Sequence, residues 1–421
     1  MRQGAGSMDR TTFRLVFLVS CAHAMAHVFE LSLPSIEPDL AREYFPSDQD
    51  AGKVFTGWLS FCWRLPWGAG ALLVGLLVDR YGSSRMLVIY LLGCGATCLL
   101  MSLHLELPML FVVMFLMGSF ASIYHPAGLT LISHCTTPDN RPRALGMHGV
   151  IGSAGIAMAP LLAGVLLQRG LAWRDYYLLL ALPGAVLGGW FLLRRSRISK
   201  DIRQLVAAGK EKERLGDGPD PESAAWLSFF VLTLLAALQG MIYAGVLTYL
   251  RRYLGVGQGD GELDRLSYAS YMMALILLCG SIGQYIAGRM AHSRSLELQL
   301  TLVCLANAPF LIWMSMAEGN TRYLAAILFS IVHFMNQPIY NSLVAKYTPS
   351  SRRSLCYGFS FMMGFGVGGL GAPLAGSLPS ELATYLVLSG VAVAAGAMGG
   401  ILCWLSRQPD QAANGHFKFT P

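Results

Sequence analysis

Long apolar runs, separated by short polar or Gly/Pro-rich segments, occupy most of the chain. A transmembrane helix needs about 20 predominantly apolar residues, and runs of at least this length recur from end to end. The expected spans lie near residues 13–36, 51–78, 85–104, 108–134, 144–167, 172–193, 225–253, 267–290, 298–317, 321–346, 354–378 and 380–405. The pattern predicts an all-α membrane protein with twelve transmembrane helices.

A polar segment divides these runs into two sets of six that repeat each other. Pro126 and Pro338, and likewise Gly146 and Gly358, lie about 212 residues apart in similar surroundings. A duplicated six-span unit predicts a substrate site at the interface of the repeats. We expect an N-terminal bundle over 1–193, a cytoplasmic connector over 194–224, a C-terminal bundle over 225–406 and a cytoplasmic tail over 407–421.

Composition excludes a soluble enzyme. Hydrophobic residues make up 54% and charged residues only 13% of the chain, against about 25% charged in soluble proteins, and the mean hydropathy is +0.50. A net charge of +7 could indicate a nucleic-acid partner. However, Lys and Arg fall mostly in alternate loops, the connector and the tails. The positive-inside rule therefore predicts cytoplasmic termini and explains the positive charge without a nucleic-acid partner. We also expect an inner (plasma) membrane location, no cofactor and no resident metal.

The loop after the second span carries a motif of a known family. Its sequence GLLVDRYGSSR resembles the loop signature of the major facilitator superfamily, G-x3-D-R-x-G followed by basic residues. The resemblance implies two six-helix pseudo-repeats around a central cavity. Its matching positions, expected at a cytoplasmic gate, are Gly75, Asp79, Arg80, Gly82 and Arg85. Gly75 is expected to let a neighbouring helix approach.

The fifth span carries small residues at helical spacing. This pattern resembles the motif of proton-coupled drug antiporters in the superfamily, with Ala at two positions where Gly is usual. Small residues permit close helix packing, and proline kinks a helix. The motif positions are Gly146, Gly155, Pro160 and Gly164. Generic helix packing is the alternative interpretation.

Deep polar residues indicate a proton-coupling site. His23, His27 and Glu30 share one helical face of the first span, and Arg64 lies deep in the second. A charge inside a bilayer costs about 2.5–3.5 kcal/mol, so we expect Glu30 and Arg64 to pair. A carboxyl that alternates between Arg and a proton suits proton coupling, and histidine, including His125, titrates in the useful range. A structural ion pair with backbone-bonded histidines is the alternative.

Spans 1, 4, 7 and 10 line the cavity in the superfamily, and they carry most polar side chains here. The expected substrate contacts are Tyr124, His125, Gln239, Tyr243, Asn336, Gln337 and Asn341. Residues 27–34 (HVFELSLP) and 121–126 (ASIYHP) further resemble the fosmidomycin-resistance type of major facilitator protein. This resemblance implies a monomeric inner-membrane carrier that exports a small organic compound in exchange for protons.

Other functions stay open from the sequence. In a proton symporter that imports an organic anion, Arg64 would hold the carboxylate of the substrate. The run His23-x3-His27-x2-Glu30 suits a transported metal ion. A transport-inactive membrane sensor is a third alternative. An enzyme is not expected, because no nucleophile, base and orienting group can be placed together.

Overall fold

The computed structural model describes residues 8–137, 140–210, 225–256, 262–290 and 295–408, and these residues form helices joined by short turns. The first half comprises α1 (Arg10–Glu30), α2 (Glu37–Tyr44), α3 (Gln49–Tyr81), α4 (Ser83–Met101), α5 (Leu107–Ala121), α6 (Tyr124–Cys135), α7 (Arg141–Gln168) and α8 (Trp173–Lys210). The second half comprises α9 (Trp226–Leu254), α10 (Glu262–Met290), α11 (Leu296–Met316), α12 (Thr321–Phe334), α13 (Asn336–Tyr347), α14 (Ser350–Phe361), α15 (Gly371–Ser377) and α16 (Glu381–Leu405).

Eleven of the described helices or helix pairs are long and apolar enough to cross a membrane. The twelfth expected span, 321–346, is present as α12 and α13, which are separated at Met335. Its counterpart in the first half is also divided, into α5 and α6. Proline explains both breaks, because Pro126 and Pro338 lack the N–H that would bond four residues back, to Ser122 and Phe334. The twelve-helix fold expected from the apolar runs is confirmed.

Two expected spans differ in detail. The first span ends at Glu30 and not near residue 36, and a turn leads into the short amphipathic helix α2. The chain between α14 and α15 forms a π-helix over Met362–Val367 and a 3-10 turn over Gly368–Leu370. A π-turn inserts an extra residue into a helix, and this irregularity lies where α3 of the other half packs.

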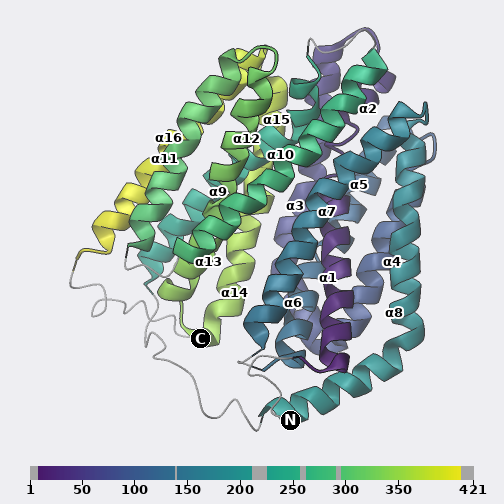
Figure 1. Ribbon diagram of the computed structural model, residues 1–421, viewed down its shortest axis with the longest axis vertical. Helices are drawn as coiled ribbons and strands as arrows, with labels where there is room; N and C mark the ends of the chain where they lie inside the picture. The colour runs from purple at the N-terminus through teal and green to yellow at the C-terminus, as the bar shows by residue number, and fades with distance from the viewer. Residues whose placement is uncertain (1–7, 138–139, 211–224, 257–261, 291–294, 409–421) are drawn as a thin grey trace.

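The two halves lie side by side, with α1 to α8 in purple to teal and α9 to α16 in green to yellow (Figure 1). Helix α10 packs against α7, and α3 packs against α14, the π-helix and α15. The closest approach joins Gly68 of α3 to the π-helix, where a Cβ on Gly68 would lie 2.3 Å from the backbone nitrogen of Gly366. The backbones can approach this closely because Gly68 has no Cβ, whereas a Cβ on Gly366 would make only ordinary contacts, at 3.6 Å.

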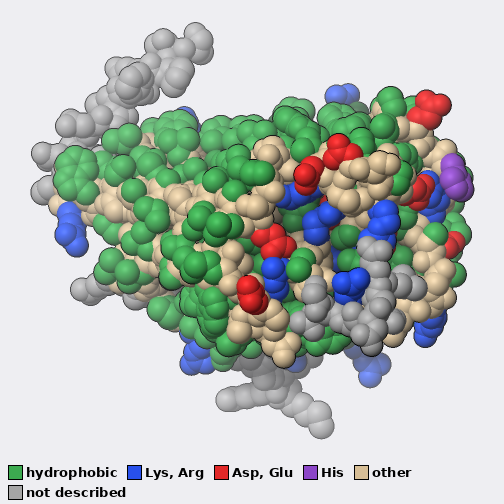
Figure 2. Space-filling model, turned by 90° about the horizontal axis from the view of Figure 1, so that it is seen from above, with side chains coloured by type: hydrophobic (Ala, Val, Ile, Leu, Met, Phe, Trp, Pro, Cys, Tyr) green, Lys and Arg blue, Asp and Glu red, His purple; other side chains and the backbone are tan. Residues whose placement is uncertain are grey.

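The long sides and the ends of the molecule differ in polarity. Large apolar side chains such as Leu193, at 85% exposed, and Val150, at 72%, point outward along the sides. In the end-on view of Figure 2, basic and acidic side chains gather on the end formed around α2. An apolar belt with charged ends is the surface that a bilayer requires.

Candidate transport site and gates

Glu30 lies at the end of α1 and is contacted from three directions. Its side chain is buried, with 3% of the residue exposed. Tyr243 of α9 donates a hydrogen bond from its hydroxyl to Glu30 Oε1 at 2.8 Å, and His27 Nδ1 lies 2.8 Å from Oε2. Since α9 belongs to the other half of the chain, this carboxyl connects the two halves directly.

Arg64 reaches the same carboxyl from α3. Its Nη1 lies 3.6 Å from Glu30 Oε1, and its guanidinium carbon lies 5.3 Å from the centroid of the Tyr243 ring. Arg64 is only 1% exposed, yet none of its side-chain nitrogens has a hydrogen-bond partner among the described residues. The expected pairing of Glu30 with Arg64 is present, but as a loose electrostatic pair.

The histidines of α1 continue the contact away from Glu30. His27 Nε2 lies 3.1 Å from His23 Nε2, and His23 Nδ1 lies 3.0 Å from the backbone oxygen of His148 on α7. The imidazoles of His23 and His148 stack with ring centroids 3.9 Å apart. His125 of α6 adds ring contacts to His23 and His27 at 5.4 and 6.1 Å. The structure therefore brings all five predicted proton-coupling residues into one cluster.

Aromatic side chains cover this cluster. Trp67 of α3 lies 6.1 Å from His125 and 4.7 Å from Phe365 of the π-helix, measured between ring centroids. Phe361 of α14 packs on His125 at 4.9 Å. These rings from both halves cover the cluster and leave the Glu30 side chain fully buried, while the His27 side chain keeps 16% of its surface exposed. Burial strengthens the electrostatic interactions of the carboxyl.

The expected substrate contacts are divided by the structure. Tyr243 and His125 belong to the central cluster, and Gln239 of α9 is 3% exposed with neither carboxamide atom hydrogen-bonded within the described residues. Tyr124 also belongs to this cluster, because its hydroxyl lies 2.8 Å from His148 Nε2 and its ring stacks on His23 at 5.1 Å. It is fully buried, and its hydroxyl donates to the backbone oxygen of Val19.

The remaining expected contacts lie on α13, at the break after α12. Asn336 is half-buried, whereas Gln337 and Asn341 are exposed. Gln337 accepts a hydrogen bond from the Gln284 carboxamide of α10 at 2.9 Å. No hydrogen bond links these side chains to Glu30 within the described residues.

At the end of the molecule formed by α2, buried ion pairs join the two halves. Arg252 of α9 donates to Glu37 of α2 from Nε at 3.0 Å and from Nη2 at 2.8 Å. Arg251 pairs with Asp39 of α2. Glu37 also accepts a hydrogen bond at 2.9 Å from the Thr56 hydroxyl. The halves are thus locked together at this end, which we call the α2 seal.

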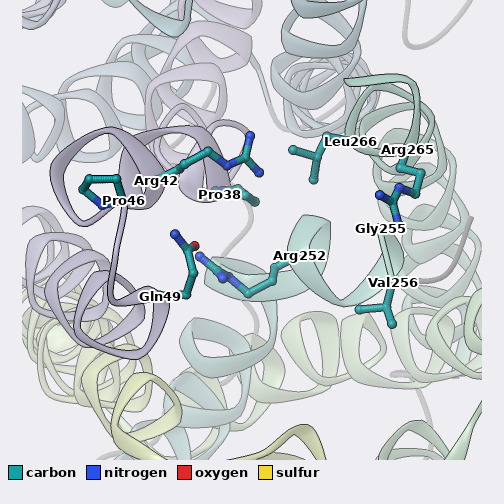
Figure 3. Close-up of a pocket in the computed structure, with 9 residues that line it drawn as sticks. All are labelled: Pro38, Arg42, Pro46, Gln49, Arg252, Gly255, Val256, Arg265 and Leu266. Atoms are coloured by element: carbon teal, nitrogen blue, oxygen red, sulfur yellow. The ribbon is translucent and has the colours of Figure 1, made fainter. Parts of the chain in front are cut away.

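A cavity of about 370 Å³ lies beside the α2 seal. The side chains of Arg42, Arg252 and Arg265 approach it from both halves, and Gln49 points into it (Figure 3). Neither Glu30 nor Arg64 lines this cavity, so it is distinct from the central cluster.

Within the described residues, the charged side chains of the loop motif after α3 form no ion pairs, unlike those of the α2 seal. Asp79, Arg80 and Arg85 are exposed. A Cβ at Gly75 would meet no atom within 4 Å, so the close helix approach expected there is absent. Gly82 does have a structural role, because it ends α3 with a φ of 83°.

These observations describe one conformation. Ion pairs join the halves at the α2 seal. Within the described residues no ion pair joins the loop motif to the other half, and the helix contact expected at Gly75 is not made.

The motif of the fifth span is carried by α7. A Cβ on Gly155 would lie 2.2 Å from the Ala24 backbone oxygen, so this glycine lets α7 pack directly on α1. Gly164 meets Ser270 of α10, where a Cβ would lie 2.9 Å from its Cβ. Pro160 is buried within α7, while a Cβ on Gly146 would meet nothing within 4 Å. Close packing thus applies to Gly155 and Gly164.

The sequence interpretation leaves out two groups of residues that the structure places at these sites. It assigns no role to His148, which contacts His23. The α2 seal was missed altogether. Its signal is the pair of acidic residues Glu37 and Asp39 after the first span, opposite in charge to Arg251 and Arg252 at the end of the seventh.

The possibility of a transported metal ion gains no support from this geometry. His23, His27 and Glu30 bond to one another, and no group of three or more His, Cys, Asp or Glu side chains in the described residues could hold a metal ion.

Two six-helix halves that meet around a buried carboxyl are the arrangement found in secondary transporters. The sequence matches the Major Facilitator Superfamily over residues 15–373, and the chain belongs to this family. It is therefore a multi-span membrane transporter of small molecules and not an enzyme.

Curated relatives include resistance proteins. The fosmidomycin resistance protein of Escherichia coli K12 is 21% identical and aligns with 90% of this chain and 89% of its own length. The puromycin resistance protein of Streptomyces alboniger is 34% identical, but the match spans only 40% of this chain and 32% of that protein. A probable sulfoacetate transporter of Cupriavidus necator is 23% identical over 93% of this chain and 94% of its own.

Solved structures support the same fold. The inward-open xylose transporter XylE of E. coli superposes with a TM-score of 0.71, at 10% identity, over 92% of this chain and 95% of its own. At this identity the likeness concerns the fold alone.

Proposed function

We propose that this protein exports a small organic compound in exchange for protons by alternating access. The observation that carries the proposal is the position of Glu30. Its carboxyl is buried, bonded to Tyr243 of the other half and paired with Arg64. Protonation changes the charge that faces Arg64 and the hydrogen bond that joins the halves, which is what coupling requires.

Relatives favour export. The matching proteins that confer resistance to fosmidomycin or puromycin protect cells from a toxic compound. This chain aligns with most of the fosmidomycin resistance protein but with only a third of the puromycin resistance protein. Fosmidomycin is therefore the first substrate to test. We also propose a monomer in the inner membrane, with cytoplasmic termini and the domain boundaries at 194–224 and 407–421.

The test is transport in proteoliposomes with an imposed pH gradient. Wild-type protein is expected to move fosmidomycin against its gradient, and Glu30→Gln is expected to lose uptake driven by the pH gradient while it still exchanges substrate at equilibrium. Glu106→Gln is the matched control, because Glu106 is exposed at the start of α5 and makes no side-chain cap. pH-driven transport that survives in Glu30→Gln would refute the coupling role.

A second candidate function has a specific observation in its favour. Arg64 is buried with free hydrogen-bond capacity, and so is Gln239, which suits a substrate carboxylate or sulfonate. The similarity to a probable sulfoacetate transporter points the same way. In a proton symporter for an organic anion, Arg64→Lys would weaken substrate binding itself. The direction of substrate flux under the same imposed pH gradient separates the two functions, because the symporter imports its substrate with protons and the exporter moves it in the opposite direction to the protons.

A further inference from the structure

We infer that His23, His27 and Glu30 form a hydrogen-bonded array. In this conformation the array holds one proton more than two neutral imidazoles and a carboxylate carry. Helix α7 sets the arrangement of the array. The inference deepens the proposed function, on which its role in transport rests. It is carried by three contacts, which join the His148 backbone oxygen to His23, His23 to His27, and His27 to Glu30.

The direction of the first hydrogen bond is settled by chemistry. A backbone oxygen only accepts, so His23 Nδ1 must carry a hydrogen that it donates to the His148 oxygen at 3.0 Å. A neutral imidazole has a single N–H. In neutral His23 the other nitrogen, Nε2, is therefore an acceptor that faces His27 Nε2 at 3.1 Å.

Counting hydrogens then requires an added proton. Each of the three contacts needs one hydrogen between its two heavy atoms. Two neutral imidazoles supply two, and a carboxylate supplies none. When His27 donates to His23 through Nε2, its Nδ1 accepts, and Glu30 must be protonated to donate at 2.8 Å. The proton can equally reside on His27 as an imidazolium beside a carboxylate. Both forms contain the same number of protons.

The added proton also explains the loose contact of Arg64. Guanidinium and carboxylate groups normally form hydrogen bonds of about 2.7–2.9 Å, whereas Arg64 Nη1 stays 3.6 Å from Glu30 Oε1. With the added proton the array is neutral overall and attracts Arg64 weakly. When the proton leaves, one of the three hydrogen bonds must break, and a full negative charge faces Arg64. The proton and Arg64 therefore compete for Glu30.

Helix α7 positions the array. The His148 ring stacks on His23 at 3.9 Å, and a Cβ on Gly152 would lie 2.3 Å from His23 Nδ1. The gap at Gly152 and the stacked ring hold His23 with Nδ1 toward α7 and Nε2 toward His27. His148 and Gly152 are thus positioning residues, which act on the proton through His23.

Other titratable groups around the array come from every helix that packs on this part of α1. Arg64 of α3 is the cation among them, and within the described residues no second carboxylate joins the cluster. The titratable groups without a permanent charge are Tyr90 of α4, Tyr124 and His125 of α6, His148 of α7, Tyr177 of α8 and Tyr243 of α9. Because His125 and His148 also titrate, the test must resolve the His27 signal from theirs.

The test is ¹⁵N NMR of histidine-labelled full-length protein in lipid nanodiscs, without substrate or gradient. We expect the His23 ring to carry its proton at Nδ1. We also expect the ¹⁵N chemical shifts of the His27 ring to change as the pH is raised, because the array then loses its added proton. In Glu30→Gln the amide supplies the third hydrogen, so this change at His27 is expected to disappear. His23→Gln assigns the His23 signals. His134→Gln is the control, because the His134 ring is exposed on α6.

Two results would overturn the inference. One is a His23 ring protonated only at Nε2. The other is a Glu30→Gln protein, folded by circular dichroism, in which the pH-dependent change at His27 persists in full. The outcome is separable from that of the transport test. If the NMR result shows the added proton but no pH-driven flux is measured, only the coupling role is refuted. If pH-driven flux is measured but the NMR result shows no added proton, only the array is refuted.

Discussion

Removal of one charge from the α2 seal is expected to open this end of the molecule. In Glu37→Gln the side chain keeps its size but loses its negative charge. The Glu37 carboxylate is fully buried and accepts two hydrogen bonds from Arg252 and one from Thr56. A Gln side chain has one acceptor oxygen, and its NH₂ group turns toward other donors.

The size of the effect follows from these contacts. A hydrogen bond between charged groups contributes about 1.5–3 kcal/mol, and two of them connect Arg252 to Glu37. The Arg252 side chain keeps 25% of its surface exposed, so hydration recovers part of the loss. In the conformation with this end open, water solvates both groups, and the substitution costs little there. We therefore expect a shift of about 2 kcal/mol toward the open conformation, roughly 30-fold in population.

Distances between spin labels measure this shift directly. Labels at Ser47 and Leu382 lie on exposed positions of the two halves near the seal, and pulsed electron resonance in a cysteine-free background reports how far apart they are. Glu43→Gln is the matched control. Glu43 also has a bidentate pair, with Arg174 at 2.5 and 2.7 Å, but both residues belong to the first half. Equal distance distributions for Glu37→Gln and wild type, or an equal shift in Glu43→Gln, would refute the reasoning.

Three further predictions follow from local contacts. Gly68→Ala is expected to disfavour this conformation in the same spin-label assay, because the added Cβ would meet the backbone of the other half. Gly155 packs within one half, so Gly155→Ala is expected to lower the free energy of unfolding by about 1–3 kcal/mol. Tyr243→Phe leaves Glu30 Oε1 without its donor and is expected to slow pH-driven transport more than substrate exchange. Burial raises the pKa of Glu43, but hydrogen bonds from Arg174 and Trp173 lower it below 4.5 overall. The stabilising pair is therefore complete above that pH and lost as acid protonates Glu43, so the difference in melting temperature between wild type and Glu43→Gln should narrow in acid.

Sequence reasoning identified most residues of the central cluster, but it did not identify the α2 seal. Glu30 and Arg64 stood out because a charge within an apolar run is costly, and helical spacing placed His23 and His27 on the Glu30 face. Tyr124 shared those signals, yet its hydroxyl bonds to a backbone oxygen of α1. Polarity within a span identifies a buried group but does not show whether that group faces a cavity or a neighbouring helix.

The role of glycine depended on conformation in a similar way. Gly75 and Gly155 occur in comparable motifs, but Gly155 lies against α1 and Gly75 meets no neighbour. A pattern of small residues permits a close approach, whereas the conformation decides whether the approach is made.

The amino-acid sequence by itself determined the membrane location, the twelve spans, the duplicated halves and the costly charges within them. These properties follow from local hydrophobicity and repeat spacing, which need no knowledge of distant contacts. Only the tertiary structure decided that Tyr243 meets Glu30, that Arg252 meets Glu37 and that the His148 backbone orients His23. Each of these contacts joins residues more than a hundred positions apart or on separate helices. Their energies depend on how the helices pack, which no short stretch of sequence encodes.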